Sequence, residues 1–261
     1  MPLTNRFKVR ASLNDWRDFR YKSTKLPLKE SVDFRPWSSK VEDQLHLGSC
    51  TGQAVVGAYE LMLKKQLPEN FKELSRLFVY YNARLIEGNV EEDQGAYVKD
   101  EVKAVYKYGV CSEELWPYDI DLFALPPSIV SYEDATHRTI KNYYKVEGLT
   151  NILDAVNSGY PVIASMQVYS NFDEVETVPN FILPYPTEND DVVGGHAIVV
   201  VGYDLLKKLI LCRNSFGDKW GLAGHFWIPF DYVVANFSDN WIFDIDIKGE
   251  MQNKKSTFVM Y

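Results

Sequence analysis

The sequence lacks long hydrophobic runs and carries no excess of basic charge. No stretch approaches the 18 apolar residues that a membrane-spanning helix needs. The net charge of −8 at pH 7 gives no general basic field for neutralising phosphates, which argues against a nucleic-acid-binding protein. With 15 glycines and 12 prolines among 261 residues, a low-complexity chain is also excluded. What remains is an ordinary globular protein, large enough to bury a core without disulfide or metal staples.

Cysteines are also scarce. The three present, Cys50, Cys111 and Cys212, cannot all pair, and the N-terminus has charge but no apolar run typical of a secretory signal. These two features predict an intracellular, reducing environment. No HExxH or CxxC spacing occurs, so we predict no metal site and no cofactor.

Charge is distributed unevenly along the chain. Residues 1–30, called the N-terminal arm below, carry a net charge of +5, whereas the remaining residues sum to −13. The arm also contains the aromatic residues Phe7, Trp16, Phe19 and Tyr21. Opposite charge and aromatic burial predict that the arm docks back on the body near a cleft, with the acidic residues 188–191 as the most attractive dock. A solvated tail is the alternative.

Helical and strand-like patterns occupy different parts of the body. Apolar spacing predicts helices over residues 51 to about 65, 75–86 and 97–108, with a shorter helix at 150–158. Short apolar runs at 162–168, 197–203, 209–213 and 226–228 predict strands of an antiparallel sheet or barrel. This order predicts an α+β fold with three parts, namely the arm (1–30), a mainly helical lobe (31–135) and a mainly β lobe (136–261).

Cys50 lies where the first predicted helix begins. A thiol at a helix N-terminus faces unpaired N–H groups and the positive end of the helix dipole, which both favour the thiolate. The small residues Gly48 and Ser49 leave room for a substrate backbone. We therefore predict that Cys50 is a nucleophile, the alternative being an inert buried cysteine.

His196 is the best-placed candidate base. It precedes the apolar run 197–203 and follows Gly194 and Gly195, so its ring is expected at the exposed mouth of a buried strand. If runs 197–203 and 209–213 form a hairpin centred near residue 205, positions 196 and 214 face each other and Asn214 can orient the ring. His46 is the rival base, but no orienting partner for it is evident.

Three further residues complete the predicted site. Gln44 can offer its side-chain amide beside the Cys50 N–H as a second donor to an oxyanion. Phe216 and Trp220 can cover the hydrogen bond between His196 and Asn214 and exclude water from it. A nucleophile, a base, an orienting group and oxyanion donors are the parts that covalent acyl transfer requires.

Five blocks of the sequence resemble the papain-like (C1) cysteine peptidases. They are SVDFR at 31–35, DQLHLGSCTGQA at 43–54, YGVCSEELWPY at 108–118, GGHAIVVVGYD at 194–204 and RNSFGDKWGLAGHFWIP at 213–229. The resemblance implies a two-lobed fold, with a helical lobe, an antiparallel β-barrel lobe and a cleft between them. It also implies a peptidase that hydrolyses peptide or protein substrates through Cys50, His196, Asn214 and Gln44.

The same resemblance implies a substrate-binding surface. Gln94, Gly95 and Ala96 match the glycine stretch that binds the substrate backbone in the family. A pocket for the side chain two residues before the cut is expected to be lined by Ser165, Met166, Gly194 and Gly195. Such small walls suggest a bulky apolar or aromatic side chain.

The departures from the family pattern are informative. Leu47 and Asp93 stand where secreted members place a disulfide-bonded cysteine pair, and Thr51 and Phe216 each replace a usual tryptophan. The long helical pro-domain of secreted members is missing, so the chain resembles the intracellular, mostly microbial branch of the family. We also expect the arm to act as a short pro-segment that restrains the enzyme as a zymogen. Two alternatives stay open, namely an acyl transferase that uses the same three residues, and a catalytically retired peptide-binding module.

Overall fold

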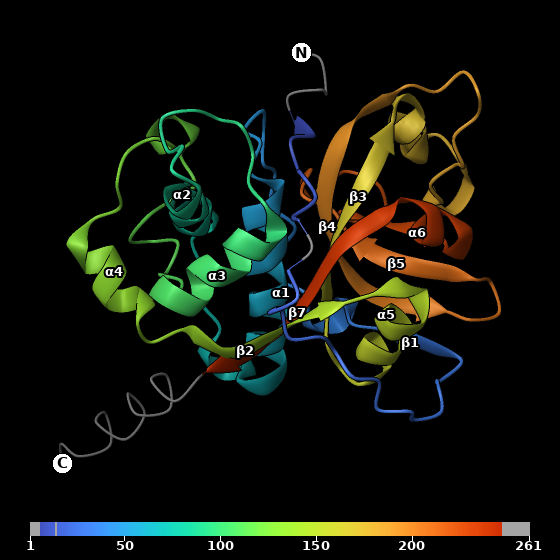
Figure 1. Ribbon diagram of the computed structural model, residues 1–261, viewed down its shortest axis with the longest axis horizontal. Helices are drawn as coiled ribbons and strands as arrows, with labels where there is room; N and C mark the ends of the chain where they lie inside the picture. The colour runs from blue at the N-terminus through green and yellow to red at the C-terminus, as the bar shows by residue number, and fades with distance from the viewer. Residues whose placement is uncertain (1–5, 14, 247–261) are drawn as a thin grey trace.

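The structure is a computed structural model that describes residues 6–13 and 15–246 (Figure 1). Six α-helices are present in this part of the chain, at α1 (Cys50–Gln66), α2 (Arg76–Glu87), α3 (Val98–Tyr108), α4 (Ile129–Ala135), α5 (Gly148–Asn157) and α6 (Phe230–Asn236). Short 3₁₀ turns lie at η2 (Arg35–Trp37), η3 (Pro68–Asn70), η4 (Ile120–Leu122), η5 (Ser170–Glu176) and η6 (Pro179–Phe181). The helices α1–α4 gather on the left of Figure 1 and the sheet lies on the right.

The four helices predicted from apolar spacing are confirmed to within about two residues at each end. Helix α2 begins as expected for a capped helix, because the Ser75 hydroxyl accepts a hydrogen bond from the Phe78 N–H. Helix α3 ends at Gly109, whose φ is 78° and where an added Cβ would lie 1.9 Å from the Ala135 carbonyl oxygen. Only glycine fits this close approach.

The sheet is antiparallel throughout, with strand order β2-β7-β3-β4-β5-β6 and β1 paired to β4. Its strands are β1 (Ser31–Asp33), β2 (Thr139–Val146), β3 (Val162–Tyr169), β4 (Val192–Asp204), β5 (Leu209–Arg213), β6 (His225–Pro229) and β7 (Phe237–Asp246). The predicted class, helices combined with an antiparallel sheet, is confirmed. Within the described ranges the strand ladders form an open path with β2 and β6 at its ends, so the expected barrel is not closed.

Helix α1 lies between helices α2–α4 and the main part of the sheet (Figure 1). It is buried from Cys50 to Leu63, which is unusual for a helix that also contains a glutamate. Glu60 is accommodated because it receives hydrogen bonds from Ser39 and Leu74 and forms an ion pair of 2.7 Å with Arg76. The burial of α1 places its first residue, Cys50, where the helices meet the sheet. In the described part of the chain, no helix is long and apolar enough to cross a membrane.

Candidate active site

Cys50 begins helix α1 and is completely buried. The backbone N–H groups of Ala197 and Thr51 lie close enough to its sulfur to act against the rise in the pKa of the thiol. Ala197 belongs to β4 and follows His196 directly, so the packing of β4 against the start of α1 brings the candidate base beside the candidate nucleophile. All three cysteines of the chain are free and buried.

His196 and Asn214 are joined as predicted. The His196 Nε2 and Asn214 Oδ1 atoms are 2.7 Å apart in a buried hydrogen bond. The other ring nitrogen, Nδ1, has no hydrogen-bond partner among the described residues. An imidazole held by one nitrogen and open at the other can exchange a proton with a neighbouring thiol.

The route to this hydrogen bond differs from the predicted hairpin. Strands β4 and β5 pair Val199 with Arg213, and their register shifts between Val200 and Gly202, so His196 is not directly opposite Asn214. Asn214 lies beyond the last paired residue, where its N–H donates to the Gly224 carbonyl oxygen instead of continuing the ladder. The observed pairing departs from the predicted register by two to three residues, mainly because Asp204 pairs with Leu209 and the turn is therefore centred beyond residue 205, and apolar patterning carries no sign of this.

Phe216 packs on the ring of His196, and Trp220 packs on Phe216. The ring centroids of His196 and Phe216 are 5.2 Å apart, and those of Phe216 and Trp220 are 5.7 Å apart. Both aromatic side chains are buried. The predicted shielding of the bond between His196 and Asn214 would therefore come from Phe216 directly, with Trp220 supporting it from behind.

Gln44 is fixed in the loop that leads to Cys50. Its Oε1 accepts a hydrogen bond of 2.6 Å from the Ser215 hydroxyl, and its Nε2 donates to the Leu47 carbonyl oxygen at 2.9 Å. Nε2 also donates, at 3.3 Å, to the carbonyl oxygen of Arg6 in the N-terminal arm. The amide predicted to bind an oxyanion therefore already faces a peptide carbonyl.

The arm passes between the helices and the sheet, where the blue segment descends in Figure 1. The Phe7 ring is buried, with its centroid 5.2 Å from that of His196, and the Val9 N–H donates to the Gly195 carbonyl oxygen at 3.0 Å. Added Cβ atoms at Gly95 and Gly194 would lie 2.3 and 2.2 Å from the carbonyl oxygens of Lys8 and Phe7. Gly95, predicted to bind a substrate backbone, and Gly194, predicted to line a substrate pocket, thus both lie against the arm. The predicted exposure of His196 is wrong, because Phe7 covers its ring and leaves it fully buried.

Three basic side chains of the arm each form an ion pair with one carboxylate of the body. Two of these carboxylates lie among the helices, and the third lies in the loop before α1. Lys8 pairs with Asp93 at 2.8 Å, Arg10 with Glu87 at 2.7 Å and Arg6 with Asp43 at 3.5 Å. Within the described ranges, no ion pair joins the arm to residues 188–191, so the predicted acidic dock is wrong. Carboxylates from separate elements bind the arm, whereas in the acidic run the Asp190 carboxylate accepts hydrogen bonds from Ser170 and Thr187 of its own surroundings.

Burial dominates the electrostatics of the pair. It raises the pKa of the Cys50 thiol to about 12, although hydrogen bonds from Ala197 and Thr51 act in the opposite direction. It also lowers the pKa of His196 to about 4, against the effect of the hydrogen bond to Asn214. With the arm in place, the site holds a neutral thiol and a neutral imidazole at pH 7. The helix N-terminus led us to expect a Cys50 thiolate. While the arm covers the site, however, the cost of desolvating the thiolate outweighs the favourable effect of the helix N-terminus, and Cys50 stays a neutral thiol.

Four of the predicted substrate-pocket residues, Ser165, Met166, Gly194 and Gly195, line one hollow of about 410 Å³. Val9 and Ala11 of the arm lie in its wall. Sequence reasoning missed the opposite wall, which comes from residues 235–238, and the Ser165 hydroxyl is 3.0 Å from that of Ser238. The missed residues lie at the junction of α6 and β7, where no apolar run marks a strand.

Other candidates lie outside this arrangement. Ala96 is buried, whereas the exposed Gln94 side chain bonds to Glu92 and does not point at the arm. His46 is exposed, which leaves it a poor rival base. His225 is buried and bonds to the Ala223 carbonyl oxygen at 2.9 Å.

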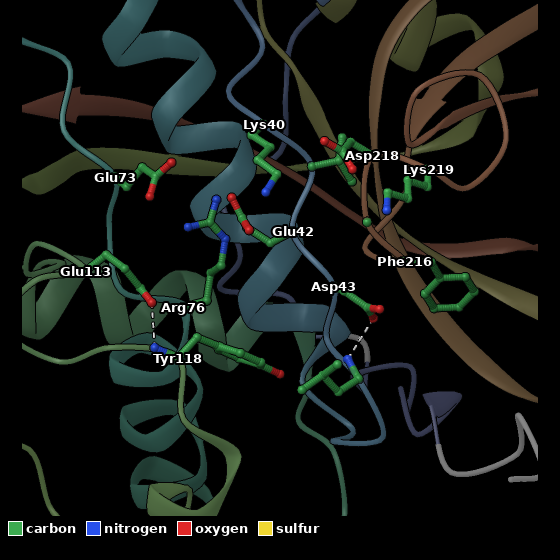
Figure 2. A pocket seen from close by; sticks show the side chains of 13 residues that line it. Lys40, Glu42, Asp43, Glu73, Arg76, Glu113, Tyr118, Phe216, Asp218 and Lys219 are labelled. Atoms are coloured by element: carbon green, nitrogen blue, oxygen red, sulfur yellow. Dashed lines mark hydrogen bonds between the residues drawn. The ribbon is translucent and has the colours of Figure 1, made fainter.

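A second hollow, of about 510 Å³, adjoins Phe216 and was not predicted (Figure 2). Its charged lining residues are Lys40, Glu42, Asp43, Glu73, Arg76, Glu113, Asp218 and Lys219. Burial raises the pKa of Glu113 to about 7, and its backbone partner is the Tyr118 N–H, as drawn in Figure 2. The Tyr118 hydroxyl in turn donates to the Gln44 carbonyl oxygen at 3.0 Å, so this hollow borders the Gln44 loop.

Comparisons with known proteins agree with this geometry. Residues 28–237 match the papain family of cysteine proteases. The chain is 36% identical over 211 residues to an uncharacterized peptidase C1-like protein of Acanthamoeba polyphaga mimivirus, which covers 77% of this chain and 68% of that protein. It superposes on xylellain, a cysteine protease from Xylella fastidiosa, with a TM-score of 0.85 and 32% identity over 92% of this chain and 96% of the other. The likeness to proCathepsin B S9 from Trypanosoma congolense, at 14% identity and a TM-score of 0.75 over 94% and 88% of the two chains, concerns the fold alone.

Proposed function

Because the chain belongs to the papain family of cysteine proteases, we propose that it hydrolyses peptide bonds with Cys50 as its nucleophile and His196 as its base. The chain is a cysteine peptidase, and peptides or proteins are its substrates. The hydrogen bond of 2.7 Å between His196 and Asn214, and the contact of Ala197 with the Cys50 sulfur, support these assignments.

In the proposed mechanism, the Cys50 thiolate attacks the carbonyl carbon of the scissile peptide bond. The Gln44 Nε2 and the Cys50 backbone N–H bind the oxyanion that forms. Protonated His196, oriented by Asn214, then gives its proton to the leaving amine, and the acyl group stays on sulfur. Neutral His196 next takes a proton from water as the water oxygen attacks the thioester carbon. The C–S bond then breaks, the acid is released, and the Cys50 thiolate and protonated His196 are restored.

One observation carries the assignment to peptide substrates: the site already binds a peptide backbone. The Arg6 carbonyl oxygen accepts from the Gln44 Nε2, and the Val9 N–H donates to the Gly195 carbonyl oxygen. The cleft thus binds a backbone carbonyl oxygen and a backbone N–H of the arm. It therefore has the shape and polarity that an extended peptide requires.

We also propose that the arm restrains the enzyme until it is displaced or cut. The arm fills the space beside Gly95 and Gly194 that a substrate backbone needs, and Phe7 packs on His196. Substrate and arm therefore compete for one surface. Removing the arm also admits water, which lowers the desolvation cost of forming the thiolate and the imidazolium.

The test is hydrolysis of a fluorogenic peptide that carries an aromatic side chain two residues before the cut. We expect a chain that begins at Leu28 to hydrolyse it, and the same chain with Cys50→Ser to be inactive and to resist a vinyl-sulfone peptide that labels the parent. Product captured mainly by an added amine would indicate an acyl transferase instead. Labelling of neither chain, with the peptide still bound, would indicate a retired binding module and contradict the proposal.

A further inference from the structure

A second buried acid lies beside the nucleophile, and the proposed mechanism does not use it. Glu101, in the first turn of α3, is fully buried, and its Oε1 accepts a hydrogen bond of 2.8 Å from the hydroxyl of Thr51. Thr51 follows Cys50 directly in α1, and its backbone N–H acts to lower the pKa of the Cys50 thiol. The acid therefore binds the residue that directly follows the nucleophile.

The surroundings of Glu101 do not suit a charge. Its Oε2 has no hydrogen-bond partner among the described residues. Glu60, a glutamate in the same lobe and equally buried, receives an arginine, a hydroxyl and a backbone N–H. A buried carboxylate without such partners is costly, whereas an uncharged carboxyl is tolerated.

The nearest cation does not neutralise Glu101. The Arg84 guanidinium donates instead to the carbonyl oxygens of Val90 and Phe123, and it stacks on the Tyr80 ring. Charges that face the acid are those of Arg84 and Glu87 from α2, Asp100 from α3 and the ionisable Cys50 of α1, with Tyr80 and Asp93 beyond them. Since Glu87 and Asp100 are also acidic, they add to the cost of a charge on Glu101.

We propose that Glu101 is a positioning residue for the nucleophile: its uncharged carboxyl holds Thr51 at the start of α1, and its ionisation sets the alkaline limit of Cys50 reactivity. This inference rests on the proposed function of Cys50. Burial raises the pKa of Glu101 to about 8, against the hydrogen bond from Thr51, so the carboxyl loses its proton as the pH rises past that value. The new negative charge raises the pKa of Cys50 and so opposes its thiolate.

The chain offers matched variants for a test. Glu101→Gln keeps the shape and the acceptor for Thr51 but cannot ionise. Asp100→Asn removes a charge one residue earlier, from a half-buried carboxylate paired with Lys103 at 2.8 Å, and serves as a variant of opposite sign, because it makes Glu101 easier to ionise. Thr51→Ser keeps the hydroxyl, whereas Thr51→Val removes it and takes away a bond that favours the ionised acid.

The experiment uses the full chain carrying Phe7→Ala, so that the arm is loosened in every variant. Two readouts are followed against pH, namely kcat/KM for the fluorogenic peptide and the ultraviolet absorbance of the Cys50 thiolate, measured as the difference from a Cys50→Ser chain. With Glu101→Gln, we expect kcat/KM equal to that of the parent well below pH 8 and about threefold to tenfold higher well above it, because one unit of Cys50 pKa is a tenfold change in thiolate. With Thr51→Val the alkaline decline should move to higher pH, and with Thr51→Ser it should stay in place. With Asp100→Asn it should move slightly to lower pH, because the variant removes a negative charge that opposes the ionisation of Glu101.

The outcomes separate two failures. A constant ratio between Glu101→Gln and its parent across the whole pH range, in both readouts, would overturn the role of Glu101 while leaving Cys50 as the nucleophile. Activity that persists in the Cys50→Ser chain would instead overturn the proposed function. If Glu101→Gln does not fold, as judged from its melting curve, the displacement expected for Thr51→Val decides the question.

Discussion

The two parts of the N-terminal arm are held by different forces. Residues 6–11 lie in the cleft, where Phe7 and Val9 are buried against the site. Residues 15–30 lie outside it, and there Trp16 and Phe19 remain 88% and 74% exposed. The same aromatic residue type is thus buried in one part and solvated in the other.

Polar contacts anchor the outer part instead. Tyr21 and Lys145 share a backbone hydrogen bond of 2.8 Å, and the Asp154 carboxylate accepts from Tyr21, Ser23 and Thr24. Lys99 binds Asp18 at 2.5 Å. These contacts are remote from Cys50 and leave the cleft untouched. The outer part therefore acts as a tether that keeps the inhibitory part at high local concentration.

The largest effect is expected for Phe7→Ala in the full chain. Truncating a buried phenylalanine costs about 3 kcal/mol, which shifts the balance between docked and displaced arm toward the displaced state. Hydrolysis of the fluorogenic peptide should rise at least about tenfold. An unchanged rate would mean that the cleft part of the arm does not restrain the enzyme.

A smaller effect is expected for Lys8→Met, which keeps the aliphatic stem but breaks the partly exposed ion pair with Asp93. Such a pair contributes about 1 kcal/mol, so activity should rise about fivefold. Added salt should raise the activity of the unaltered chain and have less effect on the variant. Equal salt responses of the two chains would rule out this contribution.

A still smaller effect is expected for Asp154→Asn. The change weakens the anchor of residues 21–24 but leaves every cleft contact in place, so the arm is only tethered more loosely. The increase in hydrolysis should be about twofold, because effective concentration falls slowly with tether length. A rise as large as that of Phe7→Ala would make the outer part the true inhibitor.

The smallest effect is expected for Trp16→Ala, the matched control for Phe7→Ala. Its side chain is 88% exposed, so its removal changes little burial. Hydrolysis should equal that of the unaltered chain. Activation by Trp16→Ala would remove the distinction between the two parts of the arm.

The features that the sequence predicts correctly are those with a local signal, such as apolar spacing or residue chemistry. Helix α1 and strand β5 follow from apolar spacing, and the residues now grouped around Cys50 were found from residue chemistry together with a family resemblance. Strand β7 escaped prediction because Asp239, Asn240 and Asp244 interrupt its apolar pattern. Because β7 was not predicted, the wall of the substrate pocket at the start of this strand was missed as well.

Long-range features were beyond the same reasoning. The turn that pairs Asp204 with Leu209 displaced the predicted register, yet the orienting bond between His196 and Asn214 still forms. Net charge predicted that the arm docks, but the partners are single carboxylates brought together by folding, such as Glu87 and Asp93. The burial of Cys50 also outweighs the effect of the helix N-terminus and reverses the expected ionisation of the thiol, which no local pattern reveals.

The central claim is that the arm keeps Cys50 and His196 neutral and that its release lets them exchange a proton. The most direct measurement is the ultraviolet absorbance of the Cys50 thiolate at pH 7, taken as the difference from the Cys50→Ser chain, in the unaltered chain and in Phe7→Ala. With the pKa of Cys50 raised to about 12 and that of His196 lowered to about 4, the unaltered chain should have no thiolate signal. The Phe7→Ala chain should gain one, and equal signals in the two chains would contradict the account.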